Sequence, residues 1–87
     1  MIKKKIQILN KLGVHARPAA LLVETANKYK SSIKVSKDTM QVDAKSIMGI
    51  MMLAAEAGSE LEFIIDGDDE IEAMNALEAL INSHFDE

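Results

Sequence analysis

The chain has 87 residues, a length that suits one hydrophobic core and leaves too little sequence for two. It contains no cysteine and no tryptophan, which excludes disulfides and thiolate metal sites and predicts an aliphatic core. The net charge is −4, yet every basic residue lies between Lys3 and Lys45. We predict a single domain over residues 1–87 that is cytoplasmic and has no membrane span. Because aromatic residues are scarce, we predict no nucleic-acid partner.

The first half of the chain predicts a strand, a helix and a hairpin. Apolar residues alternate with polar ones over 2–8, as in a half-buried strand. Over 16–29 they recur every three or four positions, which predicts a helix. Pro18 falls in its first turn, where a missing N–H is tolerated. Two short alternating segments, 33–36 and 40–43, predict a pair of strands joined by a tight turn.

The second half predicts two more helices and a last strand. Ser46 precedes an apolar run over 47–55, which predicts a short helix with Ser46 as its N-cap and Gly58 as its end. Alternation over 60–65 predicts a fourth strand, and an acidic start near Asp69 predicts the last helix. The order β-α-β-β-α-β-α indicates an α+β open-faced sandwich, with a four-stranded antiparallel sheet and three helices on one face.

The segment 13–20, Gly-Val-His-Ala-Arg-Pro-Ala-Ala, carries the candidate chemistry. His15 falls at the N-cap of the first helix, and a neutral imidazole is a nucleophile at neutral pH. The N–H groups of Ala16 and Arg17 form a cradle for an anion, to which the Arg17 guanidinium adds a charged donor. Pro18 stiffens the turn. These residues suit phosphate, although a histidine and an arginine near a helix start also occur in many chains without such a role.

Two segments carry a resemblance to a known family. The octapeptide 13–20 resembles the active-site signature of HPr, the histidine-containing phosphocarrier of the phosphoenolpyruvate-dependent phosphotransferase system. The segment 45–51, Lys-Ser-Ile-Met-Gly-Ile-Met, resembles the regulatory serine region of HPr proteins. Leu12 stands where many sugar-system relatives carry a small polar residue. Segments 10–13 and 51–55 resemble the nitrogen-related branch of the family as much as the sugar branch.

The resemblance implies a role for three residues. His15 is expected to accept phosphate through Nδ1 from phospho-Enzyme I, and Arg17 to assist its transfer to an EIIA-type acceptor. Ser46 is expected to take an ATP-derived, regulatory phosphate from HPr kinase/phosphorylase. As a plain N-cap, Ser46 would instead only stabilise its helix, by about 1 kcal/mol. The resemblance further implies a carrier that needs partner enzymes and is no enzyme by itself, that uses no cofactor, and that is a monomer.

Ile47, Met48 and Met51 are the predicted partner-docking residues, because Met-rich helix surfaces adapt to partners. Such residues are more often part of a core, so we expect a division between packed and exposed positions. His84, Asp86 and Glu87 have side chains that can bind metals, but we expect them to lie in a frayed and solvated C-terminal end. No metal site is predicted.

Two hypotheses of other classes remain open. One is a small acyl-phosphate hydrolase that binds its substrate with Arg17, although no water-positioning residue adjoins Arg17. The other is a pure interaction module that acts through the surface around Met48. In an interaction module, the substitution His15→Ala would be silent.

Overall fold

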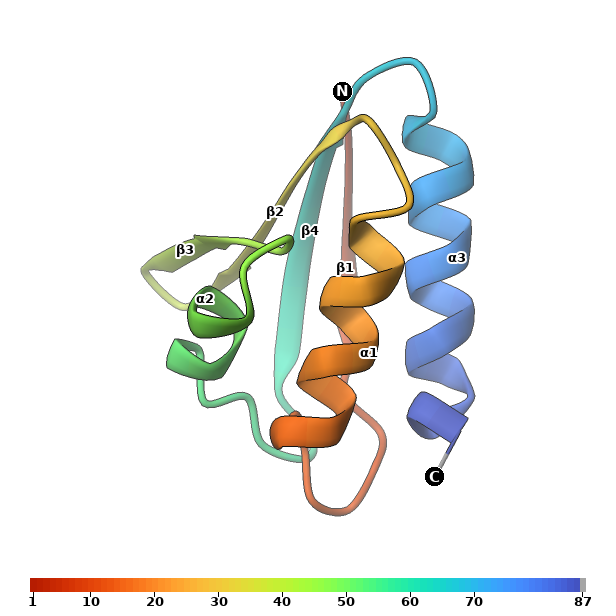
Figure 1. Ribbon diagram of the computed structural model, residues 1–87. Helices are drawn as coiled ribbons and strands as arrows, with labels where there is room; N and C mark the ends of the chain where they lie inside the picture. The colour runs from red at the N-terminus through yellow and green to blue at the C-terminus, as the bar shows by residue number, and fades with distance from the viewer. Residues whose placement is uncertain (87) are drawn as a thin grey trace.

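Strands and helices follow one another in the predicted order. The computed structural model describes residues 1–86. Its elements are β1 (Ile2–Gln7), α1 (Ala16–Ala26), β2 (Ser32–Lys37), β3 (Met40–Asp43), α2 (Ile47–Met52), β4 (Glu60–Asp66) and α3 (Glu70–Asn82). The strands form one antiparallel sheet in the order β1-β4-β2-β3, and the helices cover one face of it (Figure 1). The predicted α+β open-faced sandwich is confirmed.

The two faces of the sheet explain the alternating sequence of its strands. On the helix side, Ile6, Phe63 and Val35 are buried in the core. On the open side, neighbouring strands pair opposite charges, since Lys5 of β1 is in register with Glu62 of β4. Such cross-strand pairs stabilise a sheet surface that faces water. The open face therefore needs no second layer, and the sandwich remains one-sided.

The C-terminal end of the described chain is anchored in the core. After α3, residues His84–Asp86 form a 3₁₀ turn with positive φ angles, 56° at both His84 and Phe85. This turn brings the Phe85 side chain into contact with the core, where it is fully buried between α1 and α3. The expected frayed end is therefore wrong for this segment, although His84 and Asp86 themselves are exposed. Glu87 lies outside the described residues.

Two helices end earlier than their apolar patterns predict. α1 ends at Ala26, after which the backbone bonds tighten: the Lys28 N–H donates to the Thr25 carbonyl at 3.1 Å and the Tyr29 N–H to the Ala26 carbonyl at 3.3 Å. α2 ends at Met52, and Ala54 then adopts a positive φ of 48°, which no helix can continue. The prediction that Gly58 ends α2 is wrong. It lies in the following loop, where its N–H donates to the Ile8 carbonyl at 2.8 Å.

Asp69, the residue before α3, connects that helix to the start of β2. Its carboxylate accepts hydrogen bonds from the Lys30 N–H at 2.9 Å, the Ser31 N–H at 3.0 Å and the Ser31 hydroxyl. The Ser31 hydroxyl, followed by the Lys30 N–H, lowers the pKa of Asp69 below its ordinary 3.8, because both bonds favour the charged form. These bonds join segments that lie 38 residues apart or more.

We expect the stability that Asp69 contributes to depend on pH. A carboxyl whose pKa is lower in the folded state stabilises the fold above its unfolded pKa. That contribution is lost as the pH falls through 3.8 towards the lower, folded value. Urea unfolding at neutral pH should show that Asp69→Asn is less stable than the parent chain. The difference should shrink as the pH is lowered, and a pH-independent difference would contradict the assignment.

Candidate functional site

His15 lies at the N-terminal end of α1, where the chain leaves the loop after β1 (Figure 1). Its backbone is extended, with φ −81° and ψ −170°, and its carbonyl accepts the first bond of the helix from Ala19 N–H, at 2.9 Å. The imidazole makes no capping hydrogen bond to the first turn, and the residue is partly exposed. The predicted N-cap position is confirmed, and the ring is not consumed by helix capping.

The loop before His15 is held by a buried asparagine. The Asn10 side chain donates to the Gly13 carbonyl at 2.6 Å, and the Gly13 N–H returns a bond to the Asn10 carbonyl at 3.1 Å. Val14 is buried, and its N–H donates to the Ala55 carbonyl at 2.8 Å, which ties the loop to the segment after α2. The backbone on both sides of His15 is thus fixed by hydrogen bonds.

Gly13 is the residue that permits this close approach. Its φ is +67°, a region that side chains disfavour. A Cβ at this position would lie 2.5 Å from the Ala55 carbonyl oxygen and 2.7 Å from the Glu56 Cα. Any side chain would therefore push the loop away from the segment that supports it, and His15 would move with the loop.

The next three residues form the first turn of α1. The N–H groups of Ala16 and Arg17 precede the first intrahelical donor, so the helix supplies no acceptor for them. Both residues are exposed, whereas Pro18 is buried and has no N–H. The site therefore combines an imidazole, two backbone donors at the positive end of a helix and a guanidinium, a set that suits an anion such as phosphate.

Ser46 lies at the opposite end of α1 from His15. It is the N-cap of α2, and its hydroxyl accepts from the Gly49 N–H at 3.2 Å, which confirms the predicted cap. The preceding residue, Lys45, is bonded to the C-terminal end of α1, since its carbonyl accepts from the Asn27 side chain at 3.2 Å. With 11 residues in α1 and about 1.5 Å per residue, roughly 16 Å of helix separates the two ends.

The apolar residues of α2 divide as expected. Ile50 is buried under the helix, whereas Ile47, Met48 and Met51 are exposed. α2 packs against α1 and β3, and its last turn leads into the segment that receives the Val14 N–H. The segment that follows α2 therefore supports the loop before His15 through this hydrogen bond.

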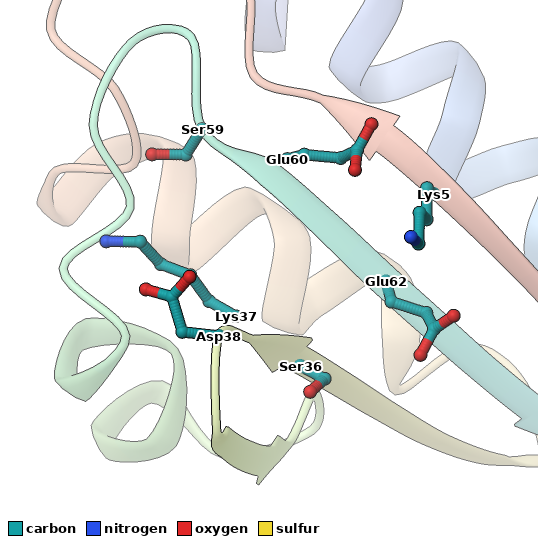
Figure 2. A pocket seen from close by; sticks show the side chains of 7 residues that line it. All are labelled: Lys5, Ser36, Lys37, Asp38, Ser59, Glu60 and Glu62. Carbon is teal, nitrogen blue, oxygen red and sulfur yellow. The ribbon is translucent and has the colours of Figure 1, made fainter.

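Sequence reasoning missed Lys37, which supports the end of α2. Its ammonium group donates to the carbonyls of Leu53 at 3.4 Å and Ala54 at 3.2 Å, across the sheet edge. Lys37 also lines a hollow of about 480 Å³ on the open side of the sheet, where Lys5 lies between Glu60 and Glu62 (Figure 2). Neither His15 nor Arg17 lines this hollow, so the sequence-predicted site lies elsewhere, on the molecular surface.

The described residues contain no candidate metal site and no candidate membrane-spanning helix. In residues 1–86, no three acidic, histidine or cysteine side chains gather in a way that could hold a metal ion. Among the helices of that range, none combines the length and the apolar character that a bilayer span requires.

Fold and site together define a small α+β protein whose histidine lies beside the backbone donors of a helix N-terminus, a site that suits phosphate. A family model described as the PTS HPr component phosphorylation site matches residues 2–83. The chain is 49% identical to the phosphocarrier protein HPr of Treponema pallidum (strain Nichols), over 100% of this chain and 99% of the relative. The chain therefore belongs to the HPr family, the phosphocarrier proteins of the phosphotransferase system.

Solved structures agree with this assignment. The crystal structure of HPr-C-His from Thermoanaerobacter tengcongensis is 53% identical and has a TM-score of 0.97, over 100% of this chain and 98% of that one. A crystal structure of an HPr dimer from the same organism has a TM-score of 0.81 at the same identity, over 100% of both chains. The family fold is therefore shared over the whole matched length.

Proposed function

We propose that the chain accepts a phosphoryl group from phospho-Enzyme I on Nδ1 of His15 and transfers it to an EIIA-type acceptor. The observation that carries this proposal is the position of His15, partly exposed at the N-cap of α1 beside the backbone donors of the first turn. A ring nitrogen attacks phosphorus as the bond from phosphorus to the donor breaks, and the reverse exchange on the next partner releases the group.

The first turn of α1 supplies the electrostatic part of this reaction. The Ala16 and Arg17 N–H groups and the helix dipole favour negative charge beside the imidazole. The Arg17 guanidinium can bond a phosphoryl oxygen and stabilise the charge that moves with the group. Pro18 fixes the backbone of the turn, so the turn loses less conformational entropy when the phosphoryl group is transferred. Because every donor is on the surface, a partner completes the site when it docks.

We further propose that Ser46 accepts a regulatory phosphate from HPr kinase/phosphorylase. A phosphoserine adds about −1.5 to −2 charges at the start of α2. Ser46 follows Lys45, whose carbonyl is bonded to Asn27 at the end of α1 away from His15, so we place this phosphate apart from the transferred one. Its effect would fall on docking, through like-charge repulsion of Enzyme I at the α2 surface.

The exposed side chains of α2, Ile47, Met48 and Met51, are the proposed docking surface for these partners. Flexible thioethers can repack against different partners, which suits a protein that must meet several in turn. The chain is proposed to act in the cytoplasm as a monomer, because the α2 surface and His15 must both be open to each partner.

The proposal is tested by incubation of the purified chain with phosphoenolpyruvate and a cognate Enzyme I. Intact mass and ³¹P NMR should show one acid-labile phosphoryl group, and none when Enzyme I is omitted. Absence of labelling with a competent Enzyme I would reject the carrier role and favour an interaction module. Turnover of free acetyl phosphate without Enzyme I would favour the hydrolase instead.

A further inference from the structure

Half of the chain's six methionines lie in α2, and all three are open to solvent. The exposed fractions are 71% for Met48, 42% for Met51 and 63% for Met52. Met40, on the neighbouring strand β3, is 42% exposed. The proposed docking surface is therefore built largely from thioether groups that small molecules in solution can reach.

The packing of α2 keeps these side chains at the surface. Ile50 anchors the helix and is only 2% exposed. Gly49 lies against β3, where an added Cβ would meet the Val42 side chain at 3.1 Å. One side of this short helix is thus committed to the core and to β3, and the methionines occupy the remainder. Chemical modification of their sulfur atoms therefore changes the surface of α2 and leaves the packing of the core unchanged.

Thioethers are the most readily oxidised groups that the chain offers, since it has no cysteine and no tryptophan. A peroxide reacts when an electron pair on the methionine sulfur attacks one peroxide oxygen. The S–O bond forms as the O–O bond breaks; the transferred oxygen loses its proton, and the leaving oxygen takes up one proton to become water or an alcohol. Sulfur is oxidised to the sulfoxide and the peroxide is reduced, so no further reactant is needed.

We infer that Met48, Met51 and Met52 form a modification site at which peroxides reduce the docking of Enzyme I. The inference rests on the proposed function, whose docking surface includes Met48 and Met51, and Met52 is exposed on the same helix. A sulfoxide replaces a flexible, apolar thioether by a polar group whose oxygen requires hydrogen bonds. An interface that buries it without a donor is weakened, and the loss is reversed when sulfoxide reductases restore the thioether.

The remaining methionines supply internal controls. Met1 is 70% exposed but lies at the start of β1, outside α2, so its oxidation reports the reactivity of an open thioether. Met74 is 5% exposed in the core beneath α3, so its oxidation reports loss of the fold. We expect Met48 and Met52 to be oxidised at rates close to that of Met1, and Met74 far more slowly.

The test begins with dilute hydrogen peroxide and peptide mapping, which do not involve Enzyme I. Sulfoxide should accumulate at the three α2 methionines while the melting temperature changes little. Oxidation of Met74 as fast as that of Met48 would overturn the inference, because the modification would then report unfolding. Resistance of all three α2 methionines would overturn it as well.

The second step measures phosphorylation of His15 by Enzyme I before and after oxidation. We expect KM for the chain to rise by about tenfold with kcat little changed, and methionine sulfoxide reductases A and B to reverse the rise. A variant with Met48→Leu, Met51→Leu and Met52→Leu, compared with its own untreated state, should be insensitive to peroxide. The control variant Met1→Leu should remain as sensitive as the parent chain.

The two proposals fail in different ways. If the untreated chain is not phosphorylated by Enzyme I, the proposed function itself is wrong. If the untreated chain is phosphorylated but full oxidation of α2 leaves KM unchanged, only the modification site is rejected. Equal sensitivity of the triple leucine variant and the parent chain would also reject it.

Discussion

The substitution His15→Ala is expected to abolish phosphorylation of the chain by Enzyme I and phosphoenolpyruvate. The imidazole is the proposed nucleophile, and alanine offers no atom that could form a bond to phosphorus. The fold should persist, because His15 holds the start of α1 through its backbone carbonyl and makes no side-chain cap. Intact mass after incubation would measure the loss, and a thermal melt would confirm that the variant is folded.

The second histidine of the chain is the matched control. His84 lies in the C-terminal turn with its side chain exposed, and it lines a hollow with Asn10 and Leu12 of the loop before α1, but it is no part of the proposed site. His84→Ala should therefore accept phosphate at the rate of the parent chain. Undiminished labelling of His15→Ala would place the acceptor on another residue and would leave α1 without its proposed chemical role.

The substitution Phe85→Ala is expected to lower the free energy of unfolding by about 3–5 kcal/mol. Phe85 is fully buried between α1 and α3, so its removal leaves a cavity and loses a large apolar contact. The loss would be a large fraction of the stability of a small domain, which is commonly about 5–15 kcal/mol. Urea unfolding followed by circular dichroism would measure it.

Ile71→Ala is the control for this experiment. Ile71 lies on α3 but is exposed, so its truncation should change the free energy of unfolding by about 0.5 kcal/mol or less. A loss at Phe85 as small as that at Ile71 would show that the C-terminal turn is detached from the core in solution.

The order of elements and the position of His15 could be predicted because their signals are local. Strand alternation, the Pro18 position and the cap at Ser46 each depend on a few neighbouring residues. The burial of Phe85 could not be predicted, because the turn that carries it has positive φ angles at residues without a glycine. Its cost is offset by core contacts with α1 and α3, which no local pattern reveals.

The support of the site was also beyond local reasoning. The sequence places Gly13 in the segment that carries His15, but the contact of Gly13 with Ala55 depends on how α2 ends. That end depends in turn on Ala54 with its positive φ and on the Lys37 ammonium group from β2. These residues lie far apart in sequence and meet only when the sheet has formed. The candidate site residues could thus be selected from local sequence signals, whereas the residues that hold them in place could not.

The pairing of β1 has a consequence for the order of events during synthesis. β1 is an edge strand whose neighbour in the sheet is β4, with Ile2 in register with Ile65. The first strand to leave the ribosome must therefore wait until β4 has emerged before it can join the sheet. The β2–β3 hairpin and α1 need no such delay, since their contacts are local. A nascent chain stalled before β4 would leave β1 unpaired and open to chaperones.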